Sequence, residues 1–266
     1  RGVTTHSTSL RAPVVVGADG LRSVVATRMG ARGRPGPLRK ISFTWHIDID
    51  DSAADLGEMH SGDGFCAGLA PVSATRCNLT IVADATRFGR SFAANPLRTA
   101  LDLIGKLPRL AGRIREHALS ADTPRTSGPF DRPVSRIADN GVVLVGDAAG
   151  YYDPFTGQGV FQALASAELL APVVAAALRS GRTDAAVFAN YVRARRRVMR
   201  GARIVQHAIE SVLSRPALAD RAIARMQRAP SFARTLIQVT GDVEPPFSLL
   251  SPRALSSLLI PLPETT

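Results

Sequence analysis

The sequence predicts an α/β protein with an inserted β-rich layer, and two distant strand–turn–helix segments carry this prediction. The first has the apolar run Val14–Val16, the turn Gly17–Gly20 and a helix over about Leu21–Met29. The second has the apolar run Val142–Val145, a turn of small residues and a helix from about Gly157 to Arg179. Short apolar runs of this kind are typical of strands covered on both faces. Strand–turn–helix order is typical of open α/β sheets.

The composition narrows the class of protein. A chain of 266 residues with 45% apolar residues suits one large or two modest globular domains. Two cysteines, Cys66 and Cys77, argue against a disulfide scaffold and predict buried thiols in a reducing compartment. The histidines have no metal-ligand spacing, and we expect no metal. Without 18 uninterrupted apolar residues or a signal peptide, we expect a cytoplasmic protein. The chain opens on a strand-like segment without Met, so we expect it to be truncated.

The breaker-rich stretch Arg32–Pro37 predicts a crossing between domains. We expect four parts: residues 1–37 and 132–185 as the two halves of one domain, 38–131 as a β-rich substrate domain, and 186–266 as a helical C-terminal region.

The middle part has the pattern of an antiparallel sheet with a helix. Ile41–Ile49 alternates with period two, and 64–71 and 76–83 read as a hairpin. A helix is expected over about 96–117, broken near Pro108, and residues 126–133 lead back towards the sheet. The acidic side chains after the first strand predict a solvated loop, with metal binding as the minor alternative: Asp48, Asp50, Asp51 and Asp55. Four side chains are interpreted as core, with a pocket lining as the alternative: Trp45, His46, Phe65 and Phe130.

The second turn has the chemistry of a flavin site. Gly146, Ala148 and Gly150 leave room for a ligand against the backbone, and Asp147 supplies a carboxylate at the carboxyl end of the strand. That carboxylate can accept hydrogen bonds from ribityl hydroxyls. A helix starting near Gly157 has free N–H groups and a positive macrodipole end, which suits the negative charge of a reduced flavin.

These residues also carry a family resemblance. Gly146-Asp-Ala-Ala149, Pro154 and Gly157-Gln-Gly159 resemble the second flavin motif of the FAD-dependent monooxygenase and geranylgeranyl-reductase-like superfamily. Gly17-Ala-Asp-Gly20 with Ser23 and Val25 resembles the Gly-Ala-Asp-Gly motif of the same superfamily. The resemblance implies an incomplete FAD-binding Rossmann-like domain, an inserted antiparallel-sheet substrate domain and a helical C-terminal tail.

The resemblance also implies where the cofactor lies. Asp147 would contact the ribityl chain, the 154–159 loop the flavin ring, and Asp19 the region near the pyrophosphate and the approach of NAD(P)H. The implied FAD-binding residues are Gly17, Asp19, Gly20, Gly146, Asp147, Ala148, Pro154, Gly157, Gln158 and Gly159. Three features depart from the family: Ala26 replaces the usual Arg, Gly150 replaces a frequent His, and no Gly-x-Gly-x-x-Gly fingerprint for the ADP half occurs.

The function implied is that of an FAD-dependent oxidoreductase with NAD(P)H as reductant. Monooxygenase-like hydroxylation of a small aromatic, polyketide or lipid-like substrate is the first interpretation. The alternatives are reduction of isoprenoid-type double bonds, or a truncated non-catalytic remnant that binds a membrane or a protein partner. The sequence identifies no catalytic acid or base.

The C-terminal region is strongly basic. Residues 179–234 contain thirteen arginines against Asp184, Glu210 and Asp220, which accounts for most of the net charge of +11. An amphipathic helix is expected, with one apolar face: Val198, Ala202, Val205, Ile209, Val212 and Leu213. The arginines suit either a solvated face or peripheral contact of helices 190–234 with the inner face of a membrane. Little aromatic interleaving occurs, so we expect no nucleic-acid binding. Ser251 and Pro252 predict the start of a last helix, to about Ile260.

Overall fold

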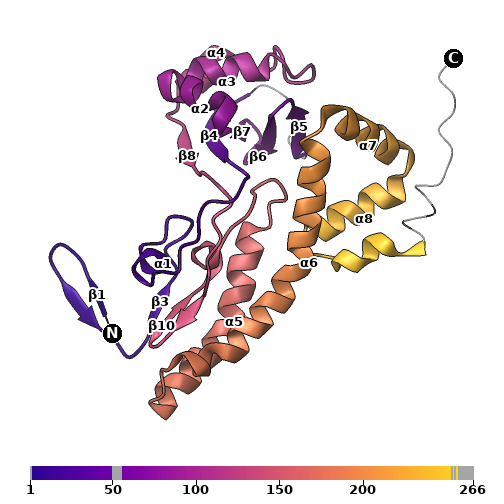
Figure 1. Cartoon of the computed structure of the whole chain (residues 1–266). Coiled ribbons are helices and arrows are strands. Elements are labelled where there is room, and N and C mark those ends of the chain that lie inside the picture. Colours follow the sequence, from indigo (N-terminus) through magenta and orange to yellow (C-terminus); the bar gives the residue numbers. More distant parts are fainter. Residues whose placement is uncertain (1, 50–55, 253, 255, 257–266) are drawn as a thin grey trace. The chain divides into compact units, whose positions relative to one another are not determined.

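The computed structural model describes residues 2–49, 56–252, 254 and 256, and the chain divides into two compact units (Figure 1). The first unit comprises Arg1–Gly36, Asp131–Glu210 and Asp220–Thr266, and the second comprises Pro37–Phe130 and Ser211–Ala219. The acidic residues Asp50, Asp51 and Asp55 lie outside the described residues. The four-part division stays a prediction.

The first unit is built on a parallel pair of strands from the two ends of the predicted domain. Strand β3 (Val15–Gly17) pairs in parallel with β10 (Val142–Leu144), and β9 (Ala138–Asp139) pairs with β10 in the antiparallel sense. The Val145 N–H donates to the Gly17 carbonyl at 3.0 Å, which continues the pairing to the start of both turns. Because the strands are parallel, the two turns that follow them meet at the same edge of the sheet.

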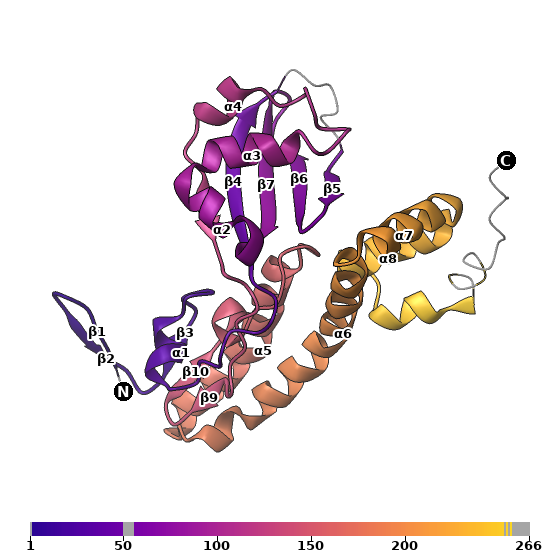
Figure 2. The same cartoon turned by 45° about the horizontal axis from the view of Figure 1, so that its top comes forward.

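Helices flank this sheet. Helix α1 (Val24–Arg28) is shorter than the predicted 21–29 because Ser23 already caps it, accepting from the Ala26 N–H at 2.8 Å. Helix α5 (Gly159–Ser180) ends on Gly181 in the left-handed region, as expected for a helix through about Arg179. After the short turn η2 (Ala185–Phe188), helix α6 (Ala189–Leu213) runs back alongside α5 (Figures 1 and 2).

The core of the first unit joins α6 to the central strand. Tyr191 is 1% exposed, and its hydroxyl donates to the Leu144 carbonyl at 2.8 Å. Other members of this core come from the sheet and the flanking helices: Ala26, Val143, Leu170 and Phe188. Of the predicted apolar face of α6, Ala202 and Val205 are buried, but the prediction is wrong for Val198, which is 45% exposed. Packing instead selects the stripe that includes Tyr191 and Met199.

Helix α5 is the one described helix with the length and composition to cross a membrane. The sequence expectation missed it because Glu168 interrupts the apolar run. Ser166, Leu170 and Ala177 are buried within the first unit. Leu170 belongs to the core of the first unit, and 17% of the most apolar 18-residue window of α5 is buried.

The chain after α6 forms short helices. These are α7 (Pro216–Arg228), α8 (Pro230–Thr240) and the 3₁₀ helix η3 (Pro246–Leu250). Ser251 accepts from the Ala254 N–H at 3.3 Å, so the predicted N-cap is confirmed, whereas the predicted end near Ile260 lies outside the described residues. In the first unit β1 (Gly2–Thr4) and β2 (Ser9–Arg11) also form an antiparallel hairpin, with three residues of each strand paired.

The second unit is an antiparallel sheet with helices on one face (Figure 2). The strand order is β5–β6–β7–β4–β8, with β4 Lys40–Asp48, β5 Glu58–Gly62, β6 Phe65–Pro71, β7 Arg76–Asp84 and β8 Arg125–Ser127. The helices are α2 Ala85–Ala94, α3 Pro96–Ile104 and α4 Glu116–Ser120. The predicted strands are confirmed. Strand β5 and helix α2 were not predicted, because β5 is a short polar edge strand and α2 follows β7 without a break.

The core of the second unit lies between the sheet and its helices. Trp45 and Phe65 belong to it, with Phe43 stacked on Phe92 at a ring-centroid distance of 4.0 Å. The core interpretation is therefore confirmed for Trp45 and Phe65, and Phe130 is 4% exposed. Both predicted thiols, of Cys66 and Cys77, are buried, and neither forms a disulfide within the described residues.

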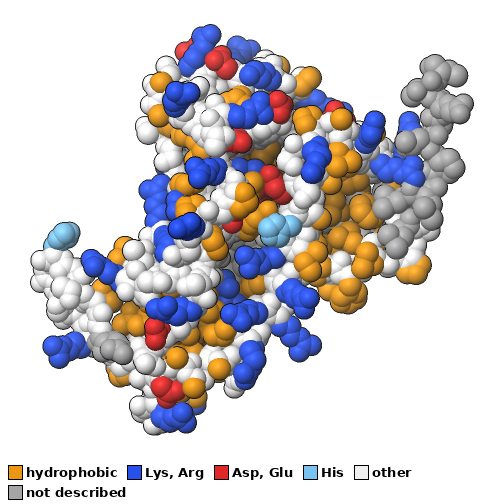
Figure 3. Space-filling model, in the orientation of Figure 1, with side chains coloured by type: hydrophobic (Ala, Val, Ile, Leu, Met, Phe, Trp, Pro, Cys, Tyr) orange, Lys and Arg blue, Asp and Glu red, His pale blue; other side chains and the backbone are white. Residues whose placement is uncertain are grey.

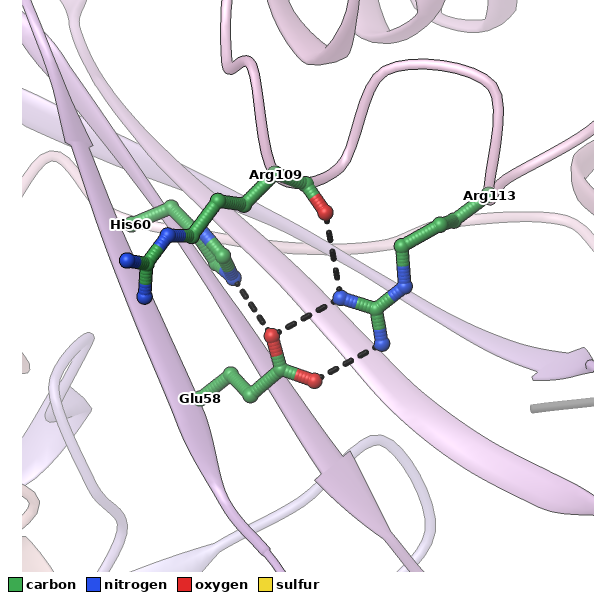
Figure 4. Close-up of polar contacts among 4 residues, drawn as sticks. All are labelled: Glu58, His60, Arg109 and Arg113. Atoms are coloured by element: carbon green, nitrogen blue, oxygen red, sulfur yellow. Dashed lines mark hydrogen bonds and ion pairs between the residues drawn. The ribbon is translucent and has the colours of Figure 1, made fainter. Parts of the chain in front are cut away.

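An ion pair fastens the edge strand of the second unit to the segment between α3 and α4 (Figure 4). Two guanidinium nitrogens of Arg113 bond the two carboxylate oxygens of Glu58 at 2.8 and 2.9 Å, and the His60 ring nitrogen lies 2.9 Å from the same carboxylate. Arg113 also donates to the Arg109 carbonyl. The hydrogen bond from Arg113, helped by His60, lowers the pKa of Glu58 to about 2.

Candidate functional site

The two turns of the first unit form one pocket of about 570 Å³. Five of the residues predicted to bind FAD line it: Gly20, Gly146, Asp147, Gly157 and Gly159. The remaining lining comes from the same turns and from the first turns of α5: Ala18, Val145, Tyr151, Val160, Ala163, Leu164 and Ala167. Residues about 125 positions apart in sequence thus share one pocket because β3 and β10 are neighbours.

The pocket has a backbone surface open to a ligand. Gly20 and Gly157 both have a φ of +71°, a conformation that L side chains rarely adopt. A Cβ added at either position would meet no protein atom within 4 Å. Glycine is therefore required at these two positions by the backbone conformation and not by contacts with neighbouring protein atoms. Because no side chain covers the backbone there, a ligand can approach it closely.

Asp147 presents a carboxylate to this pocket. It lies in the 3₁₀ turn η1 (Gly146–Ala149) that follows β10. Burial raises the pKa of Asp147, although the charge of Arg195 opposes that shift. Among the described residues, no donor forms a hydrogen bond with this carboxylate. A half-buried acceptor without a protein donor is suited to the hydroxyl groups of a ligand.

The N-terminus of α5 supplies the second polar feature of the pocket. The helix begins at Gly159, with no side-chain cap and no acidic residue in its first turn. Its first N–H groups are therefore left for solvent or a ligand, and the macrodipole favours negative charge beside Gly157 and Gly159. Loop closure by the Gly157 N–H on the Pro154 carbonyl at 3.0 Å fixes the approach to this helix.

The structure gives other predicted residues supporting positions near the pocket. The Asp19 carboxylate accepts from the Val24 and Val25 N–H groups at 2.7 and 3.1 Å, which stabilises the start of α1. Gly17 lies at a close approach, since a Cβ there would come within 2.6 Å of a methyl of Leu144. Ala148 is 2% exposed. Their contacts with a cofactor stay predictions.

The side chain of Gln158 is directed into the protein. It is 3% exposed, and its amide donates to an Asp242 carboxylate oxygen at 2.7 Å while Gln206 of α6 donates to its carbonyl oxygen at 3.4 Å. Gln206 also donates to the Thr156 hydroxyl at 3.0 Å. This network fixes the 154–159 loop, so a cofactor contact at position 158 would involve the backbone.

Sequence reasoning did not assign a site role to Arg195. Its guanidinium lies 3.4 Å from the Gly146 carbonyl, and its buried Nε forms no hydrogen bond in the described structure. Burial lowers the pKa of Arg195. Helical spacing could have indicated its burial, because Arg195 lies four residues from each of the buried residues Tyr191 and Met199 and therefore shares their face of α6. For Tyr151 the sequence did not decide between a binding role and a packing role. In the structure Tyr151 lines the pocket, and burial raises the pKa of its hydroxyl.

These features are those of an α/β unit whose pocket suits an extended, hydroxyl-bearing cofactor, with exposed backbone, a carboxylate and a helix N-terminus in its lining. The profile of the family described as "FAD binding domain" matches residues 1–208. The chain therefore belongs to this FAD-binding family, and the resemblance of its two motifs is confirmed.

The curated relatives are digeranylgeranylglycerophospholipid reductases by name. The chain is 28% identical over 180 residues to the digeranylgeranylglycerophospholipid reductase of Methanothrix thermoacetophila, an alignment of 65% of this chain and 43% of that protein. It is 40% identical over 63 residues to digeranylgeranylglycerophospholipid reductase 2 of Methanothermobacter thermautotrophicus, which covers 24% of this chain and 16% of that protein. The chain thus spans less than half the length of these relatives.

Solved structures share the fold. PqsL, a probable FAD-dependent monooxygenase from Pseudomonas aeruginosa, is 26% identical with a TM-score of 0.61, over 79% of this chain and 59% of that one. The halogenase PltM, solved with phloroglucinol and FAD, is 16% identical with a TM-score of 0.65, over 91% of this chain and 53% of that one. The predicted α/β fold class is confirmed.

Proposed function

We propose that this chain is part of an FAD-dependent oxidoreductase that takes electrons from NAD(P)H and hydroxylates a small aromatic, polyketide or lipid-like substrate. The observation that supports this proposal most is that the two flavin motifs line one pocket, in which the Asp147 carboxylate has no hydrogen-bond donor among the described residues. The bound flavin supplies the redox chemistry, and the protein supplies position and electrostatics.

The residues present suit the flavin. Asp147 accepts hydrogen bonds from ribityl hydroxyls, and the bare backbone at Gly20 and Gly157 lets the cofactor lie close. The N-terminus of α5 stabilises negative charge on the flavin ring. Arg195 offsets the charge of Asp147 and donates a hydrogen bond to the Gly146 carbonyl.

A flavin titration of the purified chain tests this assignment, followed by visible absorbance and flavin fluorescence. We expect binding that falls about tenfold or more in Asp147→Ala, since a hydrogen bond to a charged group contributes about 1.5–3 kcal/mol. Asp102→Ala, which removes an exposed carboxylate of the second unit, is the matched control. Equal affinities for Asp147→Ala and the wild type would overturn the placement of the ribityl chain.

Reduction of isoprenoid-type double bonds is the second candidate. The names of the curated relatives favour it, as does Gly150 at the position where aromatic hydroxylases often have His. Substrate-dependent oxygen consumption with NADH or NADPH supports hydroxylation, whereas anaerobic, substrate-dependent oxidation of the same reductant supports reduction. Failure of a folded chain to bind FAD would support the third alternative, a non-catalytic remnant.

Peripheral contact with a membrane is a separate proposal for the C-terminal helices. Their arginines accompany exposed apolar side chains, including Ile204, Ile223 and Ile237. Co-sedimentation with anionic vesicles, lost in high salt and absent with neutral vesicles, is the expected result. Equal sedimentation with both vesicle types, or none with either, would contradict it.

A further inference from the structure

A second concave surface of the first unit lies on the α6 side of the 149–152 loop. It is a groove of about 590 Å³ between α6, residues 133–137 and that loop. The pocket of about 570 Å³ that Gly20, Gly146, Gly157 and Gly159 line is called the glycine pocket here. Tyr151 belongs to the lining of both this groove and the glycine pocket, whereas Gly146, Asp147 and Gly157 line the glycine pocket only. The groove is therefore a distinct surface that the flavin assignment does not use.

A stripe of arginines forms one wall of the groove. Arg196, Arg200 and Arg203 are spaced by four and three residues, which places them on one face of α6, and all three line the groove. Figure 3 shows Lys and Arg side chains gathered over α6. Arg197 of the same helix is exposed but does not line the groove.

The positive charge of this stripe is not balanced locally. No carboxylate is among the groove-lining residues of the described chain, and no acidic residue occurs in α6 between Ala189 and Ile209. Like charges three and four residues apart destabilise a helix. Arg195 adds a buried guanidinium to the groove lining, and Arg203 contributes to lowering its pKa. An anion in the groove would relieve this repulsion.

The shape of the groove indicates which anion. From Arg196 to Arg203 the stripe is about 10 Å long, at about 1.5 Å of helix rise per residue. A single carboxylate contacts one guanidinium well, whereas a pyrophosphate or a phosphate ester has enough oxygens for neighbouring guanidinium groups. Beside the stripe, the rings of Tyr152 and His207 lie with centroids 4.0 Å apart and provide a surface for an organic group.

We propose that this groove binds a phosphate-bearing organic ligand, with the phosphate on Arg196, Arg200 and Arg203 and the organic part beside Tyr152 and His207. Two sources share this chemistry: a soluble nucleotide cofactor and the headgroup of a phospholipid. The site is formed by the first unit alone and does not rest on flavin binding at the glycine pocket.

Binding to the full chain tests the proposal with three probes: inorganic pyrophosphate and NADPH, each by calorimetry, and phosphatidate vesicles by co-sedimentation against phosphatidylcholine vesicles. The test variant is Arg200→Gln with Arg203→Gln. The matched control is Arg193→Gln with Arg197→Gln, which removes the same charge from the same helix outside the groove. FAD affinity of both variants is measured separately and is expected to equal that of the wild type.

We expect at least one probe to bind the wild type, with affinity that falls about tenfold or more in the groove variant and less than about twofold in the control. Preference for NADPH assigns the groove to a nucleotide, and preference for phosphatidate assigns it to a lipid headgroup. Equal losses in both variants, or no binding of any probe to the wild type, would overturn the proposal. Absence of FAD binding to the wild type, with probe binding intact, would leave the groove proposal standing and refute the flavin assignment instead.

Discussion

The geometry of the ion pair between Glu58 and Arg113 predicts how much unfolding free energy the protein loses when the pair is broken. Replacing Glu58 by Gln removes a carboxylate that accepts two hydrogen bonds from one guanidinium (Figure 4). A carboxyl pKa of about 2 instead of 4.5 corresponds to about 3 kcal/mol of unfolding free energy, at about 1.4 kcal/mol for each tenfold change. The Glu58 and Arg113 side chains are 22% and 28% exposed, and solvent screening reduces the expected loss to about 1–2 kcal/mol.

The sign of the pH dependence follows from the lowered pKa. Stability from the pair is fully present above the ordinary carboxyl pKa of 4.5 and is lost as the pH falls towards about 2. The difference between wild type and Glu58→Gln should therefore be largest near neutral pH and shrink below about pH 4.5.

Trp45 provides the assay. It is the single tryptophan of the chain, and its side chain is 1% exposed in the core of the second unit. Denaturant unfolding followed by its fluorescence thus reports on the unit that contains the pair. Asp63→Asn, which breaks an exposed ion pair with Arg87, is the control and should change stability little. A difference independent of pH, or none at neutral pH, would refute the reasoning.

Three further predictions concern the first unit. Asp147→Asn should leave the apo-protein as stable at pH 7 or more stable, because burial raises the pKa of Asp147 and disfavours its ionised form, yet weaken FAD binding about tenfold; thermal unfolding and flavin titration measure the two effects. Tyr191→Phe should lower the unfolding free energy by about 1–3 kcal/mol in denaturant titrations, because the Leu144 carbonyl loses its buried donor. Gly157→Ala should cost about 1–2 kcal/mol through its φ of +71° and weaken FAD binding, and an unchanged affinity would show that the ligand does not approach this backbone.

Local pattern was sufficient for many elements. The apolar run at 142–145, the long helix from Gly159 and the hairpin of β6 and β7 were all predicted from periodicity and turn residues. Strand β5 was not, because Glu58 and His60 are polar residues at positions where an edge strand meets a loop. The ion-pair partner of Glu58 is Arg113, which lies 55 residues away in the sequence.

The sequence by itself determined the two flavin motifs, their order and the residue types that a flavin requires, because glycine conformation and strand–turn–helix order are local properties. Tertiary structure decided which of these residues share a pocket, because only the parallel pairing of β3 with β10 brings Gly20 to Asp147. It also decided the orientation of Gln158, which hydrogen bonds to Asp242, and the burial of Arg195 among solvated arginines. Burial and partner choice depend on contacts between distant segments, and these arise only when the chain is packed.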